Sequence, residues 1–151
     1  MKIYVTGLGV VSGIGIGVSE NIEALRQRKH GIGKVTLFPT ALDVPVSEVK
    51  RSNEELKQLI SLPPQRTVSR TALLGMIAAK EAMKDAGLTP PLRIGFISAT
   101  SVGGMDLSEH FYESFKKNPG QGRLREVISH DCGASTAVSY THLTLPTNRE
   151  V

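Results

Sequence analysis

The chain has one cysteine, Cys132, and a thiolate is the strongest common nucleophile among protein side chains. It follows His130 and Asp131 and precedes Gly133. A catalytic pair needs its base within hydrogen-bond reach in space, and residues adjacent along a chain often point apart. The sequence therefore favours Cys132 as a small residue packed before a helix over Cys132 as a nucleophile.

Three serines among small residues are further candidate nucleophiles, namely Ser12, Ser101 and Ser135. None of them lies in the Gly-x-Ser-x-Gly sequence of a nucleophile elbow. Ser135 has a glycine two residues away on one side only, at Gly133. We therefore prefer a helix-capping role for Ser135.

Metal binding is also disfavoured, because a zinc site needs about four ligands at characteristic spacing. His30, His110, His130 and Cys132 show no such spacing, and His142 lies in a segment that is set aside below. We assign no catalytic, cofactor-binding or metal-ligating residue.

Two glycine motifs could bring backbone N–H groups close to a phosphate. Gly7-Leu8-Gly9 follows a strand-like run, but the dinucleotide-binding fingerprint Gly-x-Gly-x-x-Gly would need a glycine where Ser12 stands. Gly103-Gly104 precedes a helix and could hold an anion there, or form a turn that packs closely. We favour close packing for both motifs.

Two apolar runs are predicted to be buried strands, Ile3–Val11 and Leu92–Ala99, because they are rich in β-branched residues and nearly uncharged. Between Ser12 and Gly17, glycines alternate in a loop that needs positive φ or close backbone approach. The stretch Ile32–Lys50 has no helical period and contains two prolines, which predicts a loop with short strands.

Four helices are predicted from capping residues and apolar spacing. The first begins at Glu20 after Ser19 as cap and is stopped by Gly31; the second begins at a Ser52/Glu55 capping box and runs to about Ile60. The third and best runs over Ser69–Ala86, with Gly87 at its C′ position, and the fourth over about Asp106–Lys117. Strands alternating with helices predict a layered α/β fold with a mainly covered sheet.

Composition narrows the function classes. The 151 residues suit one domain, 40% are apolar, and the net charge of +4 comes from Lys and Arg spread along the chain. A nucleic-acid binder usually concentrates such charge on one face, so we predict no nucleic-acid binding. No apolar run approaches the roughly 20 residues of a membrane helix. One cysteine and no signal-peptide pattern favour the cytoplasm.

The last 14 residues, 138–151, differ from the rest. Val138–Thr147 reads VSYTHLTLPT, which carries no formal charge and does not continue the helix predicted to begin at Gly133–Ala137. On composition alone it would be an edge strand. It resembles, however, a one-frame translation of a transposon-end sequencing adapter. We therefore interpret residues 138–151 as a non-native tail and residues 1–137 as the natural sequence.

Several segments, in order, resemble the β-ketoacyl-acyl-carrier-protein synthases. The opening Val5-Thr6-Gly7-Leu8-Gly9-Val10-Val11-Ser12 with Gly15-Ile16-Gly17 is similar to the start of that family. Further similar segments are Asn21–Leu25, Gly31-Ile32, Ser69–Ala86, Asp85-Ala86-Gly87-Leu88, Ile94–Ile97 and Gly103-Gly104. The resemblance covers residues 1–137.

The resemblance implies a thiolase-like layered fold, of which this chain would be an incomplete first half, in a parent that forms a homodimer. It implies acyl transfer from acyl carrier protein to a cysteine, then decarboxylative condensation with a malonyl thioester, in fatty-acid or polyketide-type synthesis. A helix N-terminus would activate that cysteine and two histidines would stabilise oxyanion charge.

The family's cysteine lies in a Thr-Ala-Cys-Ser-Ser type motif, which this chain lacks, so neither Cys132 nor any histidine here inherits a catalytic role. Ala99-Thr100-Ser101 also lacks a glycine that many relatives have there, which leaves the subtype open. We expect the chain by itself to be inactive and to fold poorly, since its sheet would have open edges and exposed apolar surface. Alternatives are a non-catalytic partner subunit like a chain-length factor, or a small Rossmann-like binding module.

Overall fold

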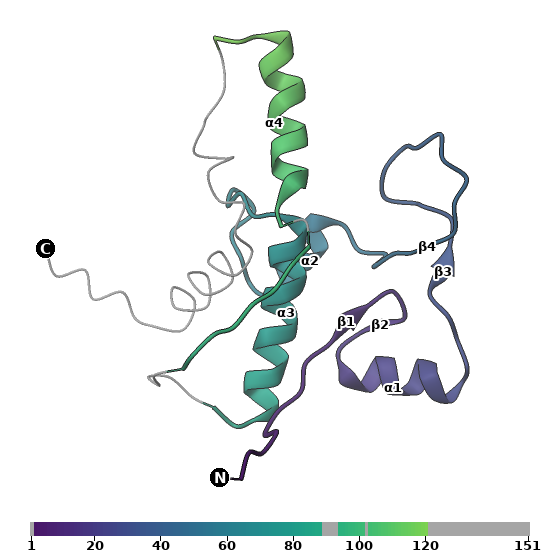
Figure 1. Cartoon of the computed structure of the whole chain (residues 1–151), viewed down its shortest axis with the longest axis vertical. Coiled ribbons are helices and arrows are strands. Elements are labelled where there is room, and N and C mark those ends of the chain that lie inside the picture. Colours follow the sequence, from purple (N-terminus) through teal and green to yellow (C-terminus); the bar gives the residue numbers. More distant parts are fainter. Residues whose placement is uncertain (1, 89–93, 102, 121–151) are drawn as a thin grey trace, which may run out of the picture. The chain divides into compact units, whose positions relative to one another are not determined.

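The computed structural model describes residues 2–88, 94–101 and 103–120 (Figure 1). Its elements, in order, are β1 (Val11–Ser12), β2 (Gly15–Ile16), α1 (Val18–Arg26), β3 (Ile32–Gly33), β4 (Val46–Ser47), α2 (Asn53–Leu59), α3 (Arg70–Asp85) and α4 (Met105–Lys117). The described residues divide into two compact units, one from 2–62 with 77–88 and one from 63–76 with 94–101 and 103–120. Helices and strands are both present, so the chain is of mixed α/β type.

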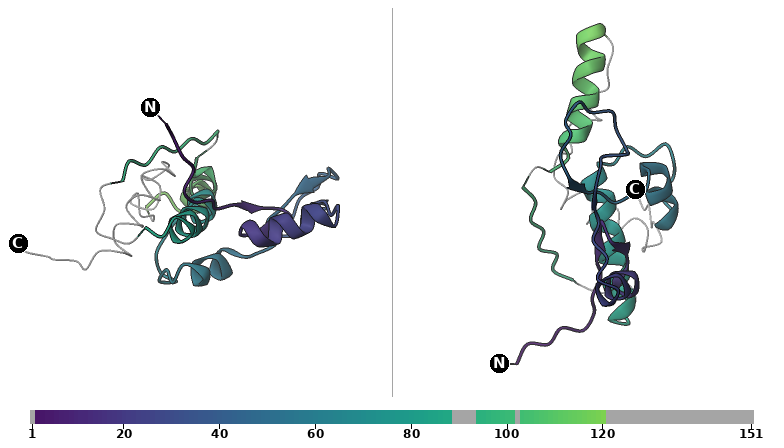
Figure 2. Two further views of the ribbon diagram at one scale, coloured as in Figure 1. Left: turned by 90° about the horizontal axis from the view of Figure 1, so that it is seen from below. Right: turned by 90° about the vertical axis from the view of Figure 1, so that its right-hand side faces the viewer.

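The first strands form a tight hairpin that leads into α1. β1 and β2 pair antiparallel with Val11 opposite Ile16, and α1 packs against both strands (Figure 2). The glycines of the hairpin are needed as predicted. A Cβ on Gly13 would overlap the Ser47 hydroxyl, and Gly17 has a φ of +94°, which residues with a side chain rarely adopt.

The predicted cap of α1 is wrong. The helix begins at Val18 after Gly17, and not at Glu20 after Ser19. The reason is that Gly17, at positive φ, turns the chain directly out of the hairpin, while carboxylate and amide side chains bind the first turn. The Val18 N–H donates to Glu81, and the Asn21 amide donates to the Gly17 carbonyl at 2.8 Å.

The predicted strand Ile3–Val11 is also wrong over most of its length, since only Val11 pairs with another strand among the described residues. A strand forms only where a neighbouring strand accepts and donates its backbone hydrogen bonds. Here the segment before Val11 lies along α3 instead, with Gly7 and Gly9 against that helix (Figure 1). Ile3 is 83% exposed as a result.

Three helices end in the same way, with a residue of positive φ at C′ and two backbone hydrogen bonds back into the last turn. For α3, the Gly87 N–H donates to the Lys84 carbonyl at 3.1 Å and the Leu88 N–H to the Met83 carbonyl at 3.0 Å. This is the Schellman arrangement, and Gly87, at φ +64°, occupies C′ as predicted.

The corresponding residues in α1 and α2 are not glycines. Arg28 (φ +54°) ends α1 and Ser61 (φ +58°) ends α2, each with the same pair of backbone bonds. The prediction that Gly31 stops α1 is therefore wrong. Gly31 instead allows close packing against the β1–β2 turn, because a Cβ there would lie 2.5 Å from the Gly13 carbonyl oxygen.

β3 and β4 pair antiparallel with Ile32 opposite Ser47, as the prediction of a loop with short strands allows. The loop between them is held by Glu48, whose carboxylate accepts the Thr36 and Leu37 N–H groups at 3.0 Å. At the neck of the loop, Lys34 pairs with Asp43 at 3.3 Å.

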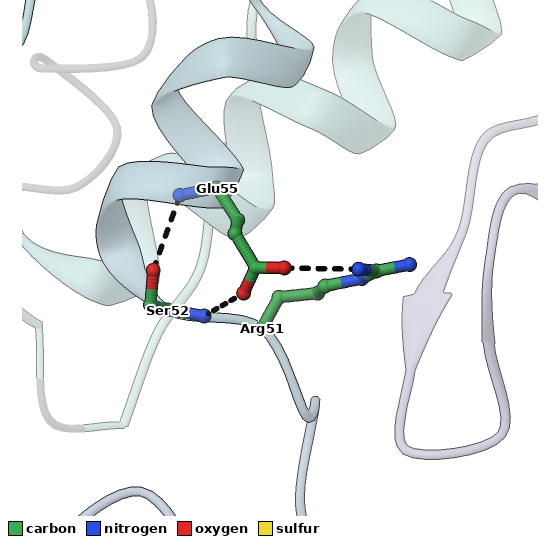
Figure 3. A network of polar contacts seen from close by, with 3 residues as sticks. All are labelled: Arg51, Ser52 and Glu55. Atoms are coloured by element: carbon green, nitrogen blue, oxygen red, sulfur yellow. Dashed lines mark hydrogen bonds and ion pairs between the residues drawn. The ribbon is translucent and has the colours of Figure 1, made fainter.

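The capping box that opens α2 is confirmed. The Glu55 N–H donates to the Ser52 hydroxyl at 3.2 Å, and the Ser52 N–H donates back to the Glu55 carboxylate at 2.7 Å (Figure 3). The Arg51 guanidinium donates to the second Glu55 oxygen at 2.9 Å. These contacts hold the pKa of the Glu55 carboxyl below its ordinary value, with the Ser52 N–H as the main cause and Arg51 second.

The predicted apolar spacing of α3 is confirmed among the described residues, since Ala72, Leu73, Met76 and Ile77 are all buried. In the first unit the buried apolar residues are Ala24, Leu56, Ile60, Leu62 and Ile77. In the second unit they are Val68, Ala72, Leu73 and Met76.

In the second unit, α4 starts at Met105, one residue before the predicted start. The predicted strand Leu92–Ala99 is wrong for its described part, Ile94–Ala99, which pairs with no described strand and leaves Ile97 98% exposed. The covered sheet is thus not present in the described residues, where the only ladders are two antiparallel pairs. None of the described helices is long and apolar enough to cross a membrane.

Candidate functional site

Within each unit, the described serine and histidine candidates form no nucleophile–base pair. Ser12 donates to the Asn21 side-chain oxygen and accepts the Ile14 N–H at 3.2 Å, so its partners are an amide and a backbone group. Ser101, His30 and His110 are exposed. No group of three potential metal ligands occurs among the described residues. Cys132, His130, Ser135 and His142 lie outside the described residues.

Gly7 and Gly9 pack directly against the backbone of α3, which is the close-packing role that we favoured from the sequence. An added Cβ on Gly7 would overlap the Ala82 carbonyl oxygen, and one on Gly9 would overlap the Ala78 carbonyl oxygen. The backbone of α3 therefore fills the side that a pyrophosphate would need in a dinucleotide site. This geometry argues against the Rossmann-like binding module.

Gly103-Gly104 forms the turn that we favoured. Gly103 has a φ of +67°, and its N–H donates to the Thr100 hydroxyl at 3.1 Å. The first turn of α4 carries Asp106, whose carboxylate accepts the Arg70 N–H at 2.8 Å. A carboxylate in that position repels an anion, so the N-terminus of α4 is a poor phosphate site.

One open hollow of about 460 Å³ adjoins the β1–β2 hairpin within the first unit. Its charged side chains are Glu20, Lys50 and Arg51, and its other residues are Ser12, Gly13, Gly15, Ile16, Val49 and Leu59. Glu20 accepts the Ile16 N–H at 2.8 Å and Arg51 binds Glu55, so both are engaged in local structure. The hollow presents no nucleophile with an adjacent base, which acid–base or covalent catalysis would require.

Two acidic residues of α3 have a role that the sequence analysis missed. Glu81 accepts the N–H groups of Val10 (3.0 Å) and Val18 (2.7 Å), and Asp85 accepts that of Leu8 (2.9 Å). The signal was present as spacing, since two acidic residues four apart on a helix can meet alternate residues of an extended segment. The described residues thus form a scaffold, with no reacting groups assembled on it.

Comparison with known proteins gives a consistent answer. The family model "Beta-ketoacyl synthase, N-terminal domain" matches residues 1–144, which reaches into the segment 138–151. Nodulation protein E from Rhizobium meliloti (strain 1021) is 29% identical over 79% of this chain and 30% of its own length. The 3-oxoacyl-[acyl-carrier-protein] synthase 2 of Coxiella burnetii is 30% identical over 75% of this chain and 28% of its own length.

A third relative is the putative polyketide beta-ketoacyl synthase 1 of Streptomyces halstedii, 28% identical over 74% of this chain and 27% of its own length. The chain therefore spans less than a third of the length of these relatives. The match lies in the part of the family that the model describes as N-terminal.

Proposed function

Because this chain belongs to the β-ketoacyl synthase family, we propose that its parent protein condenses an acyl thioester with a malonyl thioester, both carried on acyl carrier protein. The match to the family's N-terminal domain over residues 1–144 carries this proposal. A relative named as a 3-oxoacyl-[acyl-carrier-protein] synthase and one named as a polyketide synthase support the two product classes, fatty acids and polyketides.

In this proposal the parent has a thiolase-like layered fold, acts as a homodimer in the cytoplasm, and completes its catalytic set in sequence beyond this chain. The chain itself supplies the scaffold and is inactive. The support is that the described Ser12 hydrogen-bonds to Asn21 and to no base, and that the sequence has no Thr-Ala-Cys-Ser-Ser type motif.

The inactivity is tested by incubating the 151-residue chain with acyl-carrier thioester and measuring its intact mass. We expect no acyl adduct, and in particular none on Cys132. An adduct that is lost in a Cys132→Ser variant would mean that the chain carries a nucleophile, and the assignment of Cys132 to packing would be wrong.

Residues 138–151 are proposed to be non-native, on the resemblance of Val138–Thr147 to translated adapter. Sequencing the source DNA beyond codon 137 decides this, and it also decides the parent's class. A continuation with a Thr-Ala-Cys-Ser-Ser type motif supports the condensing synthase. A different residue in place of that cysteine indicates a partner subunit like a chain-length factor, and a genomic sequence encoding residues 138–151 removes the adapter interpretation.

The activity is then tested on the complete parent, with acyl and malonyl carrier thioesters as substrates. The expected result is release of CO₂ together with a 3-oxoacyl carrier thioester, both abolished when the motif cysteine is replaced by alanine. A parent that keeps the cysteine but forms no 3-oxoacyl product would contradict the proposal.

A further inference from the structure

The segment before β1 lies on α3 through a geometric match between an extended chain and a helix. Four helical residues rise about 6 Å, and two extended residues span about 6.6 Å. Gly7 and Gly9 therefore meet α3 at Ala82 and Ala78, which are four residues apart. No side chain longer than hydrogen fits at either glycine.

The same match places the alternate N–H groups of the segment beside carboxylates. Asp85 accepts the Leu8 N–H at 2.9 Å, and Glu81, four residues earlier, accepts the Val10 N–H at 3.0 Å. Hydrogen bonds to an ionised carboxylate are about twice as strong as neutral ones. The two carboxylates thus take the place that the carbonyl groups of a neighbouring strand would take in a sheet.

Glu81 differs from Asp85 because its second oxygen holds another part of the chain. That oxygen accepts the N–H of Val18, the first residue of α1, at 2.7 Å. The absent side chain of Gly17 makes room, since a Cβ there would lie 2.9 Å from the same oxygen. The Gly17 N–H in turn donates to the Val10 carbonyl at 2.8 Å. One carboxylate therefore joins the residue before β1, Val10, to the residue that begins α1 after β2, Val18.

We propose that Glu81 is a conformational clasp that holds the N-terminal segment on α3 and fixes the start of α1, so that the two attachments open together. While the clasp is closed, the Val10 N–H is engaged by α3. When it opens, the Val10 end of the β-prone segment is released to pair with another strand, while Asp85 still holds the Leu8 N–H. The Asp85 contact opens independently. This inference goes beyond the proposed function, since it needs none of the condensing chemistry.

The test is amide hydrogen exchange, resolved by residue with NMR, on the full 151-residue chain. Glu81→Gln keeps the size of the side chain but replaces one acceptor oxygen by a donor NH₂ group. We expect exchange of the Val10 and Val18 amides to accelerate together by roughly tenfold or more, while that of Leu8 changes less than about twofold. Asp85→Asn should accelerate Leu8 alone, and Glu109→Gln on α4 is the matched control that changes none of the three.

Three results would overturn the clasp. The wild-type amides of Val10 and Val18 could lack protection, Glu81→Gln could affect only one of them, or Leu8 could accelerate equally. If Glu81→Gln loses protection along the whole chain, Glu81→Asp decides the matter, because it keeps the charge but is one methylene too short to reach both amides. Loss of protection only at the Val10 and Val18 amides then supports the clasp. Unchanged protection, or an equal loss along the whole chain, contradicts it.

Discussion

The left-handed conformation of Gly87 allows a stability prediction with an internal control. Gly87 (φ +64°) and Gly33 both have open space where a Cβ would be, with no atom within 4 Å, and Gly33 is not among the residues of positive φ. Alanine at either position therefore creates no clash. The two variants differ only in the backbone conformation that the new Cβ must accept.

The expected free energies follow from that difference. An L-residue in the left-handed region costs about 1–2 kcal/mol. Replacing glycine by alanine recovers about 0.4–1 kcal/mol by restricting the unfolded chain. Gly87→Ala should therefore destabilise the end of α3 by roughly 1 kcal/mol. Gly33→Ala should stabilise the β3–β4 pair by about 0.4–1 kcal/mol.

Residue-resolved hydrogen exchange measures both local stabilities on the same chain. The Leu88 amide, which donates to the Met83 carbonyl, should exchange roughly fivefold faster in Gly87→Ala. The amides of β3 and β4 should exchange more slowly in Gly33→Ala. If the two substitutions shift local stability in the same direction by equal amounts, the left-handed C′ assignment for Gly87 is refuted.

Three further predictions concern α2 and the tail. Ser52→Ala removes the hydroxyl of the capping box and should cost α2 about 1 kcal/mol, seen as faster exchange of the Leu56 amide, whereas Ser52→Gly should cost only a few tenths. Because the pKa of Glu55 is lowered from about 4.5, its contribution to α2 is present above that pH and is lost as the pH falls through the lower folded-state value. Chemical shifts of α2 should report this loss on acidification, and a Glu55→Gln variant that shows the same acid transition would exclude Glu55 as its source. A chain ending at Ala137 should give unchanged exchange for residues 2–88, and accelerated exchange there would mean that the tail supports the fold.

Local patterns were predictable from sequence wherever the determining contacts lie a few residues apart. The Ser52/Glu55 capping box, the extent of α3 and the C′ role of Gly87 each depend on neighbours within one or two helical turns. The same holds for the turn at Gly103. Such contacts are encoded by spacing alone, because the helix geometry fixes which residues meet.

The predictions that were wrong depend instead on contacts between residues far apart in the sequence. Ile3–Val11 has the composition of a strand, but a strand also needs a partner, and no described segment supplies one. The start of α1 was missed because Glu81, more than 60 residues away, caps it in place of Ser19. Arg28 was missed as the C′ residue of α1 because the preference for glycine there is a matter of about 1 kcal/mol, which other contacts can outweigh.

For the site, sequence reasoning favoured close packing for Gly7 and Gly9 because the fingerprint lacked its third glycine, and both glycines do pack against α3. It could not identify Glu81 or Asp85, since nothing in a single sequence says which extended segment lies on which helix. Family resemblance supplied what the residues alone did not, namely the family, and that assignment is confirmed by the match over residues 1–144.

The β3–β4 pair has a consequence for protein engineering. Gly33 lies directly opposite Val46, so the chain enters and leaves the intervening loop across a single rung of the ladder. A two-residue Asn-Gly turn spans such a rung with the twist that antiparallel strands require. Residues 34–45 could therefore be excised and replaced by that turn, which would remove the exposed Leu37, Phe38, Leu42 and Val44 together. The loop is thus a replaceable module, and the same rung is a natural point at which to graft a foreign peptide.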